Sequence, residues 1–342
     1  CAYLSGPIGF MLAAGFLSMW ISNTATTLIM LPMALAILSH VDNKRLKTAL
    51  ILGIAYAASV GGLGTLIGTP PNVIFAGIYE EQTGVEFGFL DWMKIGVPVV
   101  ILALPIMALW LTRNVTLKHD IELPDPGVWR TEEKRTLIVY GLTALAWITR
   151  SEPFGGWSSA LGIIGAGDST VALLAVVMMF IVPNGKGGRL LDWQTAKSIP
   201  WDMLLLFAGG IAIAKGFSAS GLSNLLGDWL SSLSYLPPLL MMLVLCLVVT
   251  YLTEITSNTA TATLLMPILA VAALSAGYDP TVFMIPAAMA ASCAFMLPVA
   301  TAPNAIAYGT GEIDIQDMVK QGAMLSLLIS SLVAMVCFVF LV

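Results

Sequence analysis

Apolar runs, separated by short polar segments, follow one another along almost the whole chain. They lie near residues 7–21, 25–39, 48–66, 95–112, 136–149, 168–182, 201–217, 236–256, 260–276, 281–299 and 320–342. A helix needs about 20 apolar residues to cross a bilayer. Only 10% of the residues are Asp, Glu, Lys or Arg, whereas soluble domains carry about 25%. The sequence therefore predicts an all-α polytopic membrane protein.

Charge and cysteine content exclude several classes of function. The 15 basic and 20 acidic residues form no long run of one sign, so neither a nucleic-acid surface nor a basic membrane-surface helix is expected. The cysteines lie far apart without metal-site spacing, so we expect small core residues rather than disulfides or a metal centre. They are Cys1, Cys246, Cys293 and Cys337. His40 and His119 fall in polar loops, where a solvated role is expected.

A polar triplet interrupts the apolar sequence twice. SNTATTLIMLP begins at Ser22, and SNTATATLLMP begins at Ser257. Each triplet is followed by a Pro-Asn motif, GTPPN at 68–72 and ATAPN at 300–304. The spacing between the two asparagines is 49 residues (23 to 72) in the first copy and 46 residues (258 to 304) in the second. These recurrences predict an internal repeat, a construction of many secondary transporters.

The Pro-Asn motifs predict broken helices. Proline removes a helix donor and biases the preceding residue away from helical angles, so we expect breaks near 68–72 and 300–304. At bilayer depth such a break must be buried or line a wet cavity. Its carbonyl end suits a cation and its N–H end suits an anion, while Ser, Asn and Thr at the caps add ligands. Each repeat is thus predicted to hold a small hard cation beside a carboxylate. Simple helix packing by small polar residues is the alternative, which the paired recurrence disfavours.

Each triplet is flanked by two short apolar runs, which are either two spans or one hairpin that enters the membrane and turns back. The hairpin interpretation places 12 of the 15 basic residues on one face, in segments 40–47, 113–135 and 184–197 and at Lys320. The positive-inside rule makes this face cytoplasmic. The two hairpins then enter from opposite faces. We therefore predict an inverted repeat with two re-entrant helical hairpins and two broken transmembrane helices.

We predict three parts along the chain. Residues 1–112 hold the first-repeat transport elements, 113–235 the scaffold helices and connectors, and 236–342 the second-repeat transport elements.

Glu254 is an acid inside an apolar stretch, three residues before Ser257. An intramembrane carboxylate indicates function by default, but Glu254 could equally brace the hairpin tip by accepting from neighbouring backbone N–H groups. Both readings stay open. The other acids considered, Asp168, Asp202 and Asp228, are expected at membrane edges, which favours sodium coupling over proton coupling.

With its paired SNT, GTPPN and ATAPN motifs, the chain resembles the divalent anion:sodium symporters, and within them the bacterial sodium-coupled dicarboxylate transporters. The likeness covers essentially the whole sequence. The helices that such proteins have before the first hairpin do not appear. The opening CAYLSGPIGFML also lacks an initiator Met, a basic segment and a cleavage site, so we expect no signal peptide and a start within a longer protein.

The resemblance implies two sodium sites and a substrate site. The first sodium site would use Ser18, Ser22, Asn23 and the Gly68 carbonyl. The second would use Thr253, the Thr256 carbonyl, Asn258 and the Ala300 carbonyl. Substrate carboxylates would meet Asn23, Thr24, Thr69, Asn258, Thr259 and Thr301. The resemblance also implies a homodimer in the plasma membrane, working as an elevator.

The sequence thus leads to sodium-coupled symport of C4-dicarboxylates such as succinate, malate or fumarate, with no cofactor besides the coupling ion. Sulfate, citrate or arsenite remain alternative cargoes, and an Na⁺/H⁺ exchanger is disfavoured because it needs a titrating acid near the cation. An intramembrane Ser hydrolase would need a base near the Ser, and no Lys or His lies near either triplet in sequence. A channel is the third alternative.

Overall fold

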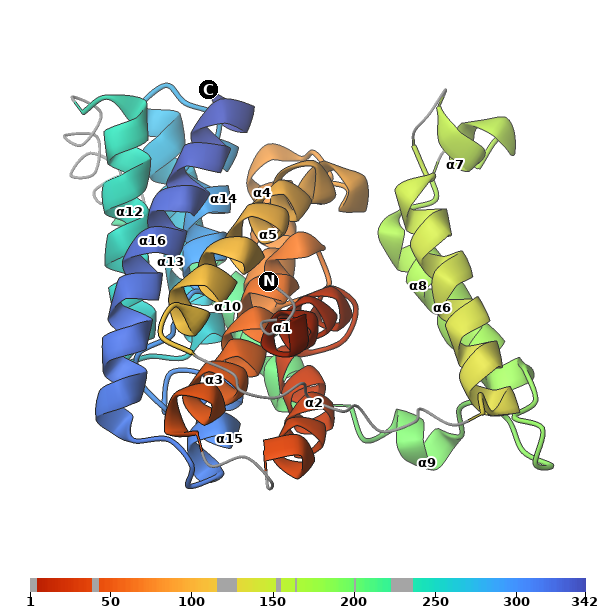
Figure 1. Cartoon of the computed structure of the whole chain (residues 1–342). Helices are drawn as coiled ribbons and strands as arrows, with labels where there is room; N and C mark the ends of the chain where they lie inside the picture. Colours follow the sequence, from red (N-terminus) through yellow and green to blue (C-terminus); the bar gives the residue numbers. More distant parts are fainter. Residues whose placement is uncertain are drawn as a thin grey trace. The chain divides into compact units, whose positions relative to one another are not determined.

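The structure is a computed structural model, and it describes residues 5–38, 43–115, 128–151, 155–163, 165–199, 201–222 and 236–342 (Figure 1). These residues form helices and no strand, apart from an isolated antiparallel bridge between Pro183 and Arg189. The predicted all-α class is therefore confirmed for the described part of the chain. The predictions for Cys1, His40, His119 and Asp228 concern residues outside these ranges. The cysteines within them, Cys246, Cys293 and Cys337, are free and buried, as expected for core residues.

The chain divides into two compact units. Unit 1 comprises residues 1–87, 91–123 and 206–342, and unit 2 comprises residues 88–90 and 124–205. This division differs from the three predicted parts, which concern function along the sequence and stay a prediction.

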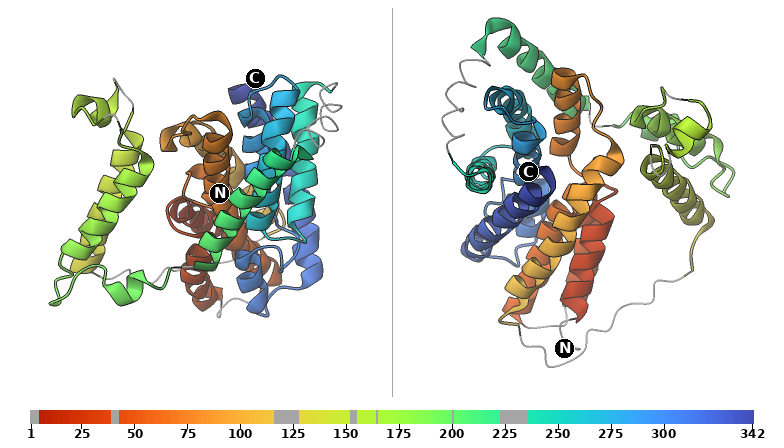
Figure 2. Two further views of the ribbon diagram at one scale, coloured as in Figure 1. Left: turned by 180° about the vertical axis from the view of Figure 1, so that it is seen from behind. Right: turned by 90° about the horizontal axis from the view of Figure 1, so that it is seen from above.

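Unit 1 holds both copies of the sequence repeat (Figures 1 and 2). The first copy contains α1 (Ser5–Ser18), α2 (Asn23–Leu38), α3 (Lys44–Gly61), the 3-10 turn η2 (Gly62–Gly64), α4 (Pro70–Thr83) and α5 (Phe89–Thr112). The second contains α12 (Pro238–Thr253), α13 (Asn258–Ser275), α14 (Thr281–Ala290), α15 (Ala302–Gly309) and α16 (Ile315–Leu341). Helix α10 (Trp201–Ser220) precedes it, and both α5 and α10 have residues in each unit.

The two copies pack on each other reciprocally. Helix α4 of the first copy contacts α13 and α14 of the second, and α15 of the second contacts α2 and α3 of the first. In both copies a glycine of the last long helix lies against the interruption. A methyl group at Gly96 would lie 2.3 Å from the Leu63 carbonyl oxygen, and one at Gly322 would lie 2.2 Å from the Phe295 carbonyl oxygen. The repeat seen in the sequence is thus also a repeat of contacts.

Four helical segments within the described residues are long and apolar enough to cross a membrane: Lys44–Gly64, Phe89–Thr112, Asn258–Ser275 and Ile315–Leu341. The other apolar helices are shorter, with 14 residues in α1 and 16 each in α2 and α12. At 1.5 Å per residue, the 16 residues of α12 extend about 24 Å, less than the roughly 30 Å of a hydrocarbon core.

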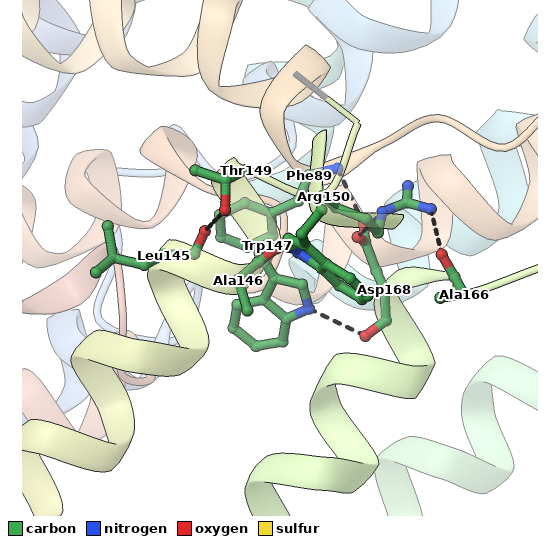
Figure 3. A network of polar contacts seen from close by, with 9 residues as sticks. Phe89, Leu145, Ala146, Trp147, Thr149, Arg150, Ala166 and Asp168 are labelled. Atoms are coloured by element: carbon green, nitrogen blue, oxygen red, sulfur yellow. Dashed lines mark hydrogen bonds and ion pairs between the residues drawn. The ribbon is translucent and has the colours of Figure 1, made fainter. Parts of the chain in front are cut away.

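Unit 2 contains α6 (Thr131–Ile148), α7 (Gly156–Ala160), α8 (Asp168–Ile181) and α9 (Trp193–Ala196). A polar network joins α6 to α8 (Figure 3). Arg150 Nε lies 2.8 Å from the Asp168 carboxylate, whose other oxygen accepts from the Phe89 N–H at 2.9 Å. The Trp147 indole donates to the Asp168 carbonyl at 3.0 Å and stacks on Phe89. Asp168 therefore has a structural role within unit 2.

Candidate functional site

The two SNT triplets form the turns between paired helices, and their serines cap the second helix of each pair. Ser22 Oγ accepts from the Ala25 N–H at 3.2 Å, and Ser257 Oγ accepts from the Ala260 N–H at 3.0 Å. Serine is favoured here because its oxygen pairs with an N–H that has no partner in the helix. Asn23 and Asn258 are consequently the first residues of α2 and α13.

Each asparagine of a triplet is paired with a hydroxyl from the preceding helix. Ser18 Oγ donates to Asn23 Oδ1 at 2.7 Å, and Thr253 Oγ1 donates to Asn258 Oδ1 at 2.8 Å. Ser18 and Thr253 are fully buried. Both pairs span five residues across a hairpin turn, so the structure places the same two oxygens at the same point in each repeat. This recurrence brings together residues predicted for each sodium site.

The interruptions of the broken helices lie earlier than the sequence predicts. Helix α3 ends at Gly61 and α14 ends at Ala290, whereas α4 begins at Pro70 and α15 at Ala302. The expected breaks near 68–72 and 300–304 are therefore corrected to the segments 62–69 and 291–301. The physical reason is that proline fits the first turn of a helix, where its missing N–H costs nothing. The prolines thus start α4 and α15 rather than end the helices before them.

In the first repeat the interruption meets the hairpin tip at Gly62. A methyl group at Gly62 would lie 2.6 Å from Asn23 Oδ1 and 3.1 Å from the Gly68 carbonyl oxygen. Glycine at this position lets an amide oxygen and a carbonyl oxygen pack closely against its Cα. Neutral oxygens that converge on one point are the ligands that hard cations take, so the donor set fits a small cation. We call Ser18, Asn23, Gly62 and Gly68 the first pocket.

In the second repeat Thr253 joins the interruption directly. Its Oγ1 lies 3.0 Å from the Ala291 carbonyl oxygen as well as 2.8 Å from Asn258 Oδ1. We call Thr253, Asn258 and Ala291 the second pocket. The Ala291 carbonyl was not among the predicted ligands, since its partner lies 38 residues away in sequence. Gly62 was missed for the same reason, because its partner Asn23 lies 39 residues earlier in the sequence, although the run of glycines around Gly62 indicated close packing.

Glu254 directly follows Thr253 of the second pocket and is buried, with 3% of its surface exposed. Its carboxylate accepts from the backbone N–H groups of Phe295 and Met296 at 2.7 and 2.9 Å and of Leu297 at 3.0 Å. These donors belong to the interruption and not to the hairpin tip. The bracing interpretation of Glu254 is therefore supported, with the braced segment corrected to 295–297.

The remaining predicted residues lie around the two pockets with different exposure. Thr69 is buried, and its hydroxyl lies 3.4 Å from Ser292 Oγ of the other repeat. Thr301 caps α15 by accepting from the Asn304 N–H at 3.2 Å. Thr24 and Thr259 are half-buried next to the asparagines, and Ala300 is buried. Thr256 is exposed, and its hydroxyl pairs with Leu252 and Thr261. Their roles as ligands stay predictions.

These features define a membrane protein in which hydroxyl, amide and carbonyl oxygens gather twice, each time where a hairpin tip meets a helix interruption. No group of three His, Cys, Asp or Glu side chains in the described ranges could hold a metal ion. The helix N-termini beside the gathered oxygens offer partial positive charge to an anion. Irregular backbone that holds cations and anions together is typical of secondary transporters.

Residues 4–282 match the citrate transporter family. The chain therefore belongs to this family, among transporters rather than enzymes. It is 44% identical, over 94% of its own length, to the sodium-dependent dicarboxylate transporter SdcS of Staphylococcus saprophyticus, and covers 66% of that protein. It is 41% identical, over 97% of its length, to the protein of the same name from Staphylococcus aureus strain USA300, and covers 68% of it.

The chain thus spans about two thirds of the length of the curated relatives it matches. Family membership and the apolar helices together show a multi-pass protein of the plasma membrane.

Proposed function

We propose that this protein imports C4-dicarboxylates, such as succinate, malate or fumarate, together with sodium ions. The observation that carries the proposal is the pair of hydroxyl-amide contacts, Ser18 with Asn23 and Thr253 with Asn258, each placed against a helix interruption. The relatives named sodium-dependent dicarboxylate transporters support both the ion and the cargo.

Two sodium ions fit the charge of the cargo. Carboxyl pKa values near 4 leave a C4-dicarboxylate as a dianion at pH 7. Each uncompensated charge faces a desolvation cost and about 2.3 kcal/mol per 100 mV of membrane potential. Two sodium ions, one in each pocket, neutralise the dianion. A third would let an inside-negative potential drive uptake.

The first sodium ion is held by Ser18, Ser22, Asn23 and the Gly68 carbonyl. The second is held by Thr253, Asn258 and the carbonyls of Thr256 and Ala300, to which the position of Ala291 adds a further carbonyl. The two carboxylates of the cargo meet Asn23, Thr24 and Thr69 on one side and Asn258, Thr259 and Thr301 on the other. The hydroxyls and helix N-termini there supply donors for anions.

We further propose that the two copies form an inverted repeat whose hairpins are re-entrant, and that a homodimer works as an elevator. The 16 residues of α12 fall short of a full span, which supports a re-entrant second hairpin. The reciprocal packing of α4 on α13 and of α15 on α2 supports a two-fold relation between the copies.

Sodium-dependent uptake of radiolabelled succinate into proteoliposomes tests the function. Asn23→Ala and Asn258→Ala are each expected to abolish uptake, because each removes an amide oxygen from one pocket. Unchanged uptake by either variant would defeat the assignment. The control is uptake with potassium replacing sodium, which is expected to stay at background.

Citrate is the second candidate cargo, favoured by the description of the matched family. A thermal-shift series with succinate, malate, fumarate, citrate and sulfate, each in sodium and in potassium, separates the two. A ligand that binds the folded state with sodium raises the melting temperature only in sodium. We expect the largest sodium-dependent shift with a C4-dicarboxylate, and a larger one with citrate would reassign the cargo.

A further inference from the structure

We propose that Asn72 and Asn304 are positioning residues for the two sodium sites, because their side-chain amides fix the shape of the two helix interruptions. This inference rests on the proposed sodium-coupled function. Neither residue belongs to the predicted ligand set, and both lie in the first turn of the helix that follows an interruption.

The two amides make the same contacts in both repeats. Asn72 Nδ2 donates to the Gly62 carbonyl at 2.9 Å and to the Thr65 carbonyl at 2.8 Å. Asn304 Nδ2 donates to the Ala294 carbonyl at 3.1 Å and to the Leu297 carbonyl at 3.0 Å. In each repeat the acceptors lie 10 and 7 residues before the asparagine. One amide thus ties the irregular segment to the start of the next helix.

The side chains of Asn72 and Asn304 are fully buried, and their amide oxygens differ from their amide nitrogens in having no partner in the described part of the chain. Among the described residues, neither Asn72 Oδ1 nor Asn304 Oδ1 has a hydrogen-bond partner. A buried acceptor without a partner costs free energy, so an apolar side chain of similar size would fill the space better. The asparagines are explained by their donors, since among neutral side chains of this size only an amide has two N–H groups to direct at two carbonyls.

In the first repeat the clamped carbonyl lies next to the first pocket. Asn72 holds the carbonyl of Gly62, the residue whose Cα faces Asn23 Oδ1 and the Gly68 carbonyl oxygen. A methyl group at Gly68 would lie 2.4 Å from the Gly62 carbonyl oxygen, so Gly62 and Gly68 are packed in contact. Loss of the Asn72 amide would therefore free Gly62 and change the distance between Asn23 Oδ1 and the Gly68 carbonyl oxygen.

In the second repeat the clamp acts together with Glu254. Leu297 donates its N–H to the Glu254 carboxylate, while its carbonyl accepts from Asn304. The segment 294–297 is thus held by an acid on one side and an amide on the other. Residues that orient ligands without touching the ion commonly change affinity by about 10- to 100-fold when mutated.

The test is sodium titration of Asn72→Leu and Asn304→Leu, read by thermal shift with succinate present and by succinate uptake. Leucine keeps the approximate size and removes the donors. Each variant is expected to raise the sodium concentration for half-maximal effect at least about tenfold. Maximal uptake at saturating sodium is expected to stay within about twofold of the wild type, because the ligands themselves remain. A purely structural role would lower folded yield and maximal rate without shifting the sodium concentration.

Ser59→Ala is the matched control, since this fully buried hydroxyl of α3 donates only to the Ala55 carbonyl of its own helix at 3.2 Å. It is expected to leave the sodium dependence unchanged. If a leucine variant does not fold, Asn72→Ser or Asn304→Ser removes the amide with a smaller side chain, and the same shift is expected.

If the wild-type protein responds to sodium and the variants show the same sodium dependence, the inference about Asn72 and Asn304 is overturned and the proposed function stands. A wild-type protein with no sodium response would overturn the proposed function, and the inference with it.

Discussion

The first and second pockets share a hydroxyl-amide pair and the clamp formed by the amide of Asn72 or Asn304, but different residues pack against them. In the first pocket Gly62 lies in close contact with Asn23 Oδ1, and Met19 packs on Gly64. The Met19 carbonyl also accepts a hydrogen bond from the Thr65 hydroxyl. In the second, Ala294 takes the place of Gly62 relative to the clamp, and Glu254 takes the place of Met19. The first pocket is therefore supported by close packing, and the second by a buried carboxyl group.

This difference makes the two pockets separable by mutation. The same motif occurs at both hairpin tips, but the residues that support it differ. A mutation of a supporting residue is therefore expected to affect one pocket and to leave the other intact.

The largest effect is expected from Gly62→Ala. The new methyl group would lie 2.6 Å from Asn23 Oδ1, closer than carbon and oxygen tolerate, so the Asn23 amide would have to shift. Displacement of ligands by about 1 Å can cost about 100-fold in rate, so sodium-dependent succinate uptake is expected to fall by at least that factor. Ala294→Gly is the matched control in the second repeat, with little change expected. Uptake near wild-type level in Gly62→Ala would remove the basis for the first pocket.

Glu254→Gln tests the buried carboxyl group as an acceptor. A glutamine amide cannot accept with both of its polar ends, so at least one of the three backbone N–H groups of 295–297 loses its partner. A buried donor without a partner costs about 1–3 kcal/mol. We expect a lower melting temperature in potassium buffer and weaker sodium binding at the second pocket, measured by thermal shift. Met19→Leu is the control in the first repeat. Equal melting temperatures for Glu254→Gln and wild type would contradict the bracing role.

The hydroxyls of the two pairs are expected to have similar, smaller effects. Ser18→Ala and Thr253→Val each remove one hydrogen bond of about 0.5–1.5 kcal/mol and one proposed sodium ligand, so the sodium concentration for half-maximal uptake is expected to rise by at least roughly two- to tenfold. Thr27→Val is the control, because the Thr27 hydroxyl donates to the Asn23 carbonyl and not to its amide. A shift in only one of the two variants would show that the pairs are not equivalent.

The smallest effect is expected where the two copies meet at an exposed ion pair. Lys44 at the start of α3 lies 2.5 Å from the carboxylate of Asp314, just before α16. Both side chains are exposed, so water and salt screen the pair. Lys44→Met is expected to leave the melting temperature and the sodium dependence unchanged. A marked loss of either would show that the copies are joined by charge rather than by the buried packing of α4 and α15.

The sequence alone predicts the motifs of the pockets well, because their signals are local. Ser22 and Ser257 are helix caps by residue type, and the prolines mark the interruptions within a few residues. The supports could not be predicted. Gly62 meets Asn23 and Glu254 meets Phe295 only through folding, across 39 and 41 residues. The prolines themselves misled on position, since they are equally suited to begin a helix as to follow one.

The contacts of the Asn72 and Asn304 amides could not be predicted from the sequence either. The TPPN and TAPN motifs make Asn72 and Asn304 visible in the sequence, but nothing local shows that each amide reaches back to carbonyls 10 and 7 residues earlier.

Equilibrium binding of radioactive sodium to the purified protein, with succinate present, tests the twin pockets most directly. Wild type is expected to bind at least two sodium ions per chain, Asn23→Ala and Asn258→Ala each one fewer, and the double variant two fewer. An unchanged number of bound ions in the double variant would contradict the placement of sodium at the two hairpin tips.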